Sequence, residues 1–279
     1  MKRIIVSVVL CTLLGVLWGE SWEIKADMSL LFNQNAYSDN WDGTESGSIN
    51  WTMNFNGLAQ KQLTPIMHNK NTLKLAFGQT HSQDKETKDW ARPEKSTDLI
   101  DFESMLRFTL GSYVDPFAAF RWESQFYDNS VPGDTKIINP MTFTESFGIA
   151  KIFKQTSWEL STRLGAAFKQ FQDSRIEDVI DKNDGGIEFV GEYRTVILDN
   201  QVSFLSKLIL YKALYNSNSD DLEGTEEEDY WKETDVTWEN VFSTNIAKYL
   251  TVNLTTKLIY DKETSLKGQF KETLSLGLT

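Results

Sequence analysis

Two histidines and one cysteine are the side chains of this 279-residue chain that most often serve as nucleophiles, general bases or metal ligands. His81 stands beside Ser82, but consecutive residues of a strand point to opposite faces, so their adjacency gives no nucleophile–base contact. Such a contact would need a serine on a neighbouring strand, and the other histidine, His68, falls in an expected turn. The sequence has no HxxxH spacing and no glycine-rich phosphate loop. We therefore expect no catalytic residue, cofactor or metal site, and interpret the protein as not an enzyme.

Seven acidic residues are packed between Tyr215 and Tyr230. Carboxylate oxygens in this number can hold Ca²⁺ or bridge through divalent ions to anionic lipid headgroups. Because the acids show no ordered ligand spacing, we favour a solvated, mobile loop. The stretch 181–186 resembles a calcium loop but lacks the downstream glutamate, so we interpret it as a turn. The seven acids of the first cluster are Asp220, Asp221, Glu223, Glu226, Glu227, Glu228 and Asp229.

Composition excludes several classes of protein. The chain has 28 basic and 40 acidic residues, and the formal net charge of −12 argues against a nucleic-acid binder, which needs a basic face. One cysteine excludes a disulfide framework and any cysteine-rich metal site. Aromatic residues make up 13% of the chain, which excludes a disordered acidic tail. The length allows one large domain or two small ones with a sizeable core.

The N-terminus carries the pattern of a secretory signal peptide. Lys2 and Arg3 precede an apolar run from Ile4 to Trp18, and Gly19 is a small residue where cleavage could fall. The run is too short for a membrane-spanning helix. Cys11 would suit a lipoprotein, but a leucine stands where that signal needs a small residue, so we favour ordinary export. We expect residues 1–19 to be removed and residues 20–279 to form the mature domain.

Apolar and polar residues alternate with a period of two along the mature chain, which indicates strands with unlike faces. In one segment Ile49, Trp51, Met53 and Phe55 alternate with asparagines and a threonine. We count twelve such segments, although the phase of the sixth and the ninth is ambiguous. They begin near Trp22, Ser48, Thr72, Leu99, Asp115, Met141, Ser157, Ile187, Gln201, Asp235, Leu250 and Gly268.

The connections between these segments alternate between long polar loops and tight turns. The long loops are Asn35–Gly47, Ser82–Asp98, Tyr127–Pro140, Phe171–Gly186 and Tyr215–Thr234, with a shorter polar one at Lys262–Lys267. The tight turns are Thr64–Lys70, Gly111–Val114, Lys154–Thr156, Leu198–Asn200 and Lys248–Tyr249. Long outer loops, short inner turns and an even strand number are typical of an outer-membrane barrel.

We therefore predict an all-β protein, a transmembrane antiparallel up-and-down β-barrel of about twelve strands with both termini periplasmic. The alternative is a soluble β-sandwich or lipocalin-like barrel with its apolar face inward, but twelve long strands with regular connections would be unusual there. Aromatic residues near the expected strand ends suit the girdles of a membrane barrel. These residues are Trp22, Trp158, Trp238 and Tyr249.

The polar face of the segments carries nearly equal numbers of acids and bases, which we expect to line the lumen. Rings of such charges could select solutes, or opposite charges could pair across the lumen and hold a narrow barrel shut. A twelve-stranded barrel lies between the filled lumen of eight strands and the open channel of sixteen. The acids are Asp27, Asp101, Glu103, Glu123, Glu159, Glu188, Glu192, Glu239 and Asp261. The bases are Lys25, Lys74, Arg107, Arg121, Arg163, Lys169, Arg194, Lys207, Lys257 and Lys271.

Both ends of the mature chain resemble an uncharacterised family of Gram-negative outer-membrane barrels, known only as a domain of unknown function. The opening resemblance lies in Ser29–Gln34 followed by Asn40 and Trp41. The closer resemblance lies in Asp235–Trp238, Lys248–Leu250, Leu258–Asp261, Gly268–Glu272 and Gly277–Leu278. The resemblance implies the barrel fold and the location, but no activity.

The sequence departs from this family in two places. Asp42, Gly43 and Thr44 stand where we expect paired glycines. The chain also ends at Leu276–Thr279 without the terminal aromatic residue of most substrates of the barrel-assembly machinery. A truncated C-terminus or a variant insertion signal would explain this ending.

The function that we expect is a passive small-solute channel, porin-like, with a mixed-charge lumen. The alternative is a closed structural or surface-interaction barrel that acts through its long acidic outer loops. The expected location is the outer membrane of a Gram-negative-type envelope. The expected partners are outer-membrane lipid, the barrel-assembly machinery during insertion, and small solutes, with no nucleic acid.

Overall fold

The computed structural model describes residues 21–38, 45–111, 113–174, 182–199, 201–248 and 250–278. The predicted signal peptide, residues 1–19, lies outside the described residues. The same holds for residues 40–44, which carry part of the family resemblance, for Asp181, and for Tyr249 of the expected girdle.

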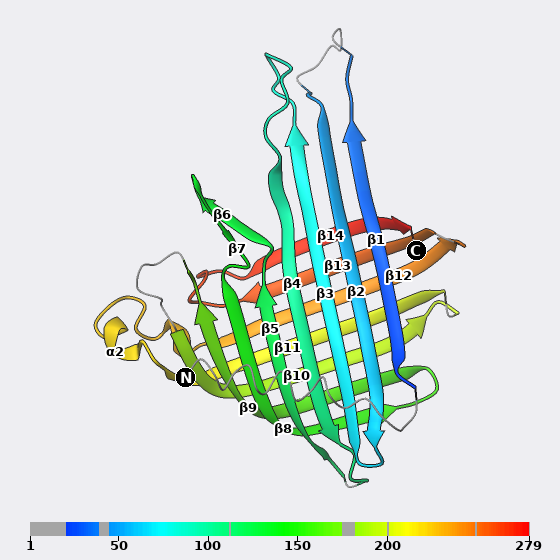
Figure 1. Ribbon diagram of the computed structural model, residues 1–279, viewed down its shortest axis with the longest axis vertical. Coiled ribbons are helices and arrows are strands. Elements are labelled where there is room, and N and C mark those ends of the chain that lie inside the picture. Colours follow the sequence, from blue (N-terminus) through cyan, green and yellow to red (C-terminus); the bar gives the residue numbers. More distant parts are fainter. Residues whose placement is uncertain are drawn as a thin grey trace.

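Twelve antiparallel strands form one sheet in chain order, each paired with its neighbours along the chain, and the sheet curls into a nearly closed barrel (Figure 1). This confirms the predicted fold class and strand number. In Figure 1 the N-terminal strands form the near wall, and the C-terminal strands cross behind them. The strands are β1 (Glu23–Asn35), β2 (Ser48–Thr64), β3 (Met67–Ser82), β4 (Glu94–Phe108), β5 (Asp115–Ser124), β8 (Met141–Lys154), β9 (Trp158–Gln172), β10 (Lys182–Ile197), β11 (Val202–Asn216), β12 (Thr234–Ala247), β13 (Leu250–Tyr260) and β14 (Gln269–Leu278).

The barrel is apolar outside and charged inside, the reverse of a water-soluble domain. Residues opposite each other in an antiparallel ladder share a face, so the register carries one face around the whole sheet. On β1, Ile24 is 72% exposed and Phe32 is 64% exposed, while Ser29 on the other face is buried. The outward face of the later strands is apolar and exposed in the same way. Its large side chains include Phe147, Ile149, Leu164, Phe168, Leu258, Phe270, Leu274 and Leu276.

The register also resolves the two ambiguous segments. On β8, Thr144 and Ser146 are buried on the inward face, while Phe147 and Ile149 are exposed outside. On β11, Ile209 and Tyr211 point inward with Lys207, opposite Val190 and Glu188 of β10. Apolar residues therefore occupy both faces of β11, which is why alternation alone leaves its phase open.

Several strands begin earlier than alternation predicts. β3 begins at Met67, β4 at Glu94 and β10 at Lys182, each about five residues before the expected start. The interpretation of 181–186 as a turn is thus wrong for 182–186, which belong to β10 and pair with β9. The early residues are mostly polar, because strand pairing is a backbone property that continues where no apolar face is needed.

The expected loops contain structure of their own. The connection 127–140 folds into the hairpin β6 (Tyr127–Val131) and β7 (Asp134–Ile137), with Gly133 at positive φ in its turn. The acidic segment contains the short helix α2 (Ser219–Leu222) and the 3₁₀ turn η1 (Tyr230–Lys232). Among the described residues, no helix has the length and apolar character that crossing a membrane would need.

The first and last strands meet without a ladder of hydrogen bonds between them in the described residues, so the barrel has a seam. The strands touch where Gly277 of β14 faces Ser29 of β1. A Cβ atom at position 277 would lie 2.8 Å from the Cβ of Ser29, closer than two such atoms normally approach. Glycine is therefore the residue that lets the barrel close at this point.

This contact predicts a disulfide staple. Residues 20–279 contain no cysteine, so the double variant Ser29→Cys, Gly277→Cys has no competing thiol. We expect a disulfide on mild oxidation, because the strands need to separate by only about 1 Å to reach the usual Cβ–Cβ distance of about 3.8 Å. Electrophoresis with and without reductant measures it, and Ile24→Cys, Gly277→Cys is the control, since Ile24 faces outward. A disulfide in the control variant alone would contradict the contact between Ser29 and Gly277.

Candidate functional site

Ion pairs cross the lumen between strands that are not neighbours in the sheet. Lys74 of β3 lies 2.7 Å from Glu239 of β12. Lys70 of β3 lies 3.4 Å from Glu192 of β10. Because β3 is seven places from β12 in the strand order, these side chains meet only by spanning the interior. The lumen is therefore bridged by charged side chains at these levels.

The most buried bridge is centred on Arg163 of β9, which is 8% exposed. Its guanidinium lies 2.5 Å from a carboxylate oxygen of Glu103 on β4 and 3.6 Å from Glu188 on β10. It also contacts the sulfur of Met105 at 3.7 Å and lies over the ring of Phe117, 5.8 Å from its centroid. A guanidinium removed from water in this way depends on its carboxylate partners, because an unpaired buried charge is very costly.

A second group of ion pairs joins the neighbouring strands β4 and β5. Arg121 of β5 donates two hydrogen bonds of 3.0 Å to the two carboxylate oxygens of Asp101, and lies 2.8 Å from Glu123. This two-point contact fixes both the charge and its orientation. Nearer the turn end, Arg107 pairs with Asp115 at 3.0 Å.

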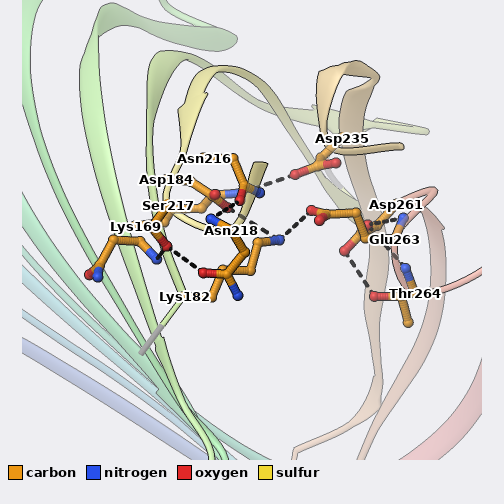
Figure 2. A network of polar contacts seen from close by, with 11 residues as sticks. Lys169, Lys182, Asp184, Asn216, Ser217, Asn218, Asp235, Asp261, Glu263 and Thr264 are labelled. Carbon is orange, nitrogen blue, oxygen red and sulfur yellow. Dashed lines mark hydrogen bonds and ion pairs between the residues drawn. The ribbon is translucent and has the colours of Figure 1, made fainter. Parts of the chain in front are cut away.

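A polar network occupies the opposite, loop end of the lumen (Figure 2). Lys182 of β10 contacts Asp184 and Glu263, and so ties β10 to the β13–β14 loop. Lys169 of β9 lies 3.2 Å from Asp235 of β12 and sits over the ring of Tyr211, 3.6 Å from its centroid. Lys169, Tyr211 and Asp235 also line a cavity of about 90 Å³, together with mostly charged and polar side chains.

The acidic segment folds back onto this end of the barrel. Trp231 of η1 packs against the buried, inward-facing residues Ala167, Tyr211 and Ala213. The seven acids of the segment are exposed, and among the described residues no group of three or more candidate side chains could hold a metal ion. Lys232 donates a 2.6 Å hydrogen bond to Asp229, which lowers the pKa of that carboxyl. The segment thus covers part of the loop end of the barrel while its acids face solvent.

Most of the residues predicted to line the lumen are brought together by these contacts, but a few lie at its ends. Lys25 pairs with Glu23 at an exposed strand end, and Glu159 pairs with Lys154 beside a turn. Asp27 accepts a 3.0 Å hydrogen bond from Asn56 at an exposed position. The residues in the lumen pairs are Lys74, Asp101, Glu103, Arg107, Arg121, Glu123, Arg163, Lys169, Glu188, Glu192, Arg194 and Glu239.

Four further predicted residues differ in their surroundings. Lys207 lies opposite Glu192 and Glu239 in the ladder, and Lys257 lies opposite Glu239 and Lys271. The Nζ atom of Lys271 donates a 3.3 Å hydrogen bond to Thr97 across the barrel. Asp261, in contrast, follows β13 and accepts hydrogen bonds from the amides of Glu263 and Thr264. It shapes a turn at the loop end of the barrel, as aspartate often does.

Sequence reasoning missed four contributors to the network. Lys70 falls in the expected turn Thr64–Lys70 and Lys182 in the stretch 181–186 interpreted as a turn, because both precede the alternating apolar residues of their strands. Asp235 marks the expected start of a strand, where the sequence predicts no role for it, and Tyr211 falls in the segment of ambiguous phase. When the period-two pattern of β3 and β10 is continued to earlier residues, Lys70 and Lys182 fall on the inward face. This signal could have identified both residues from the sequence.

The two histidines lie apart. His68 is on the inward face of β3 opposite Arg107, and its Nδ1 atom is buried without a hydrogen-bond partner in the described structure. His81 is on the outward face at the other end of β3, opposite Ile49. The two rings therefore cannot share one site.

The Arg163 bridge predicts a large loss of stability on substitution. In Arg163→Met, Glu103 and Glu188 lose their common cation while remaining buried, which should cost about 3–5 kcal/mol. The measurement is urea unfolding of the refolded barrel in lipid vesicles. Lys25→Met is the matched control, since its pair with Glu23 is exposed and should cost less than about 1 kcal/mol. Equal losses of unfolding free energy in the two variants would contradict a stabilising role of the Arg163 bridge.

The contact of Trp231 predicts protection of the acidic segment. We expect Trp231→Ala to speed cleavage by a glutamate-specific protease within residues 223–228 by about tenfold, because the segment then detaches from the barrel. Mass spectrometry of the fragments locates the cuts. Leu222→Ala, a change in the same segment outside the Trp231 cluster, serves as control. Unchanged cleavage in Trp231→Ala would show that this contact does not hold the segment.

Comparison with solved structures finds chains that are similar at low sequence identity. It is similar to the translocator domain of the autotransporter NalP from Neisseria meningitidis, with 8% identity, a TM-score of 0.38, and coverage of 100% of this chain and 95% of that chain. It is also similar to the COG4313 outer membrane channel from Pseudomonas putida F1, with 13% identity, a TM-score of 0.45, and coverage of 94% and 95%. No curated protein matches the chain.

The family model described as a protein of unknown function (DUF3078) matches residues 32–129, about a third of the chain. The closing hairpins, where we expected the closer resemblance, lie outside this match. The expected resemblance to a family without an assigned activity is thus confirmed over the first part of the barrel.

Proposed function

We propose that the barrel spans an outer membrane, with its tight turns and both termini in the periplasm and its long loops outside. The exposed apolar face supports this proposal, because such a face needs a lipid environment. Exported as the N-terminal pattern predicts, the chain would reach that membrane from the periplasm.

Aromatic side chains lie near both ends of the outward face, as in the interfacial girdles of membrane barrels. At the turn end, the rings of Trp158, Tyr193, Phe204 and Phe242 follow one another across four strands, with centroids 6.2, 6.3 and 4.6 Å apart. At the loop end, Phe77 contacts Trp51 and Tyr127 at 5.7 Å each. The position of the two sets at opposite ends of the outward face supports a membrane between them.

Within that membrane, we propose a barrel that is closed to free solute flow and acts as a structural or surface-interaction protein. The observation that carries this proposal is the bridging of the lumen by pairs from non-adjacent strands, above all Lys74–Glu239 and Glu103–Arg163. Passive solute passage, the role first expected from the inward charges, would require these pairs to separate. The exposed acids of the loop 215–234 are the surface offered to an outside partner, and the proposal includes no catalytic reaction.

Current through a planar bilayer tests this proposal. We expect no discrete steps from the unmodified barrel, and steps from the variant Lys74→Ala, Glu103→Ala, Arg163→Ala, Glu239→Ala, because it lacks two of the bridges. Heat-modifiable electrophoretic mobility verifies folding of each protein. Glu23→Ala, Lys25→Ala removes an exposed pair of the same charge types and should stay silent. Stable, ion-selective steps from the unmodified barrel would overturn the closed state and favour the channel.

A further inference from the structure

The seam between β1 and β14 opens into a cavity of about 470 Å³ beyond the contact of Ser29 with Gly277. Strands β1 and β2 line one side of this cavity, and β13 and β14 line the other. Its volume lies within the range of about 300–1,000 Å³ that small-molecule sites occupy. We call it the seam cavity.

Two kinds of side chain line the seam cavity, one from each face of the wall. The outward residues Phe32, Trp51, Leu274 and Leu276 supply apolar surface. The inward residues are Leu31, Asn33, Asn50, Thr52, Thr273 and Ser275, and all of them except Leu31 supply uncharged polar groups. None of the described residues that line the cavity is charged. The cavity therefore reaches from the outer, apolar surface toward the lumen.

The backbone at the seam also needs a partner. Residues 31–33 of β1 and 273–276 of β14 face each other across the cavity, and no ladder joins the two strands in the described chain. At membrane depth, water is absent, and each unsatisfied N–H or C=O group costs several kcal/mol. A ligand with hydroxyl groups and an apolar tail would satisfy these edges and fill the cavity together.

We propose that the seam cavity binds one long-chain, lipid-like molecule with an uncharged hydroxyl head, of the monoacylglycerol class. The acyl chain lies against Phe32, Trp51 and Leu274. The hydroxyl groups hydrogen-bond to Asn33, Asn50 and the open strand edges. A carboxylate head would find no cation among the lining residues, which distinguishes this ligand from a free fatty acid. The inference rests on the proposed membrane location, since the molecule enters from lipid.

Photolabelling tests this inference. The barrel is refolded into phosphatidylcholine vesicles that contain a trace of diazirine-bearing monododecanoylglycerol, irradiated, and digested for mass spectrometry. We expect labelling of residues 31–33 and 273–276 about tenfold above that of Leu164–Phe168 on the outward face of β9, as a site-specific preference requires. Excess unlabelled monododecanoylglycerol should remove only this enrichment. The diazirine analogue of dodecanoic acid should show none.

Matched variants separate binding from folding. Thr273→Trp places an indole in the seam cavity and should abolish the enrichment. Thr255→Trp changes the residue opposite Thr273 in the ladder, which does not line the cavity, and should retain it. Heat-modifiable mobility verifies that both variants are folded.

Each outcome bears on a different claim. Even labelling around the outward face of the unmodified barrel would overturn the seam site while leaving the membrane location intact. No labelling of any outward residue would overturn the membrane location itself. Enrichment that persists in Thr273→Trp would show that the label reports the outer surface rather than the cavity, and equal labelling by the dodecanoic acid analogue would overturn the uncharged head.

Discussion

The pairing of charges inside the barrel is the constraint on which the rest of the structure depends. Because the outward face is largely apolar, most ionisable groups of the strands lie on the lumen side, and the buried ones there depend on opposite charges. The Arg163 bridge shows the consequence, since one guanidinium serves carboxylates from two other strands while packed against Met105 and Phe117. The ion pairs thus hold opposite walls of the barrel together, as an apolar core does in a soluble domain.

This arrangement makes the interior a connected network rather than a lining. A ring of independent charges would leave a water-filled bore and set a field across it. Here Lys74 and Glu239 meet although they are 165 residues apart in the chain. At the loop end, the network of Figure 2 and the packing of Trp231 continue the same closure. Strands, charges and loop therefore all favour a narrow interior.

The seam is where this closure is weakest. Every other strand of the barrel has hydrogen-bonded neighbours on both sides, whereas β1 and β14 meet through a glycine contact beside a cavity. The cavity joins the apolar outside to an uncharged stretch of the inner wall, so it offers a route into the barrel wall that avoids the charged network. A closed lumen and an open seam are thus compatible, because they involve different strands and different chemistry.

The amino-acid sequence alone predicts the twelve strands, their order along the sheet and the face of most side chains, because period-two alternation is a local property of the chain. The alternation leaves the phase of the sixth and ninth segments, β8 and β11, open. It also predicted that inward acids and bases would be near balance. The pairing of the charges depends on the three-dimensional structure, because Lys74 reaches Glu239 through the curvature of the sheet, and no local pattern encodes that distance. The early start of β10 at Lys182, the docking of Trp231 and the seam at Gly277 were decided in the same way. Each depends on contacts between segments far apart in the chain, where backbone pairing and packing, rather than hydrophobic periodicity, set the structure.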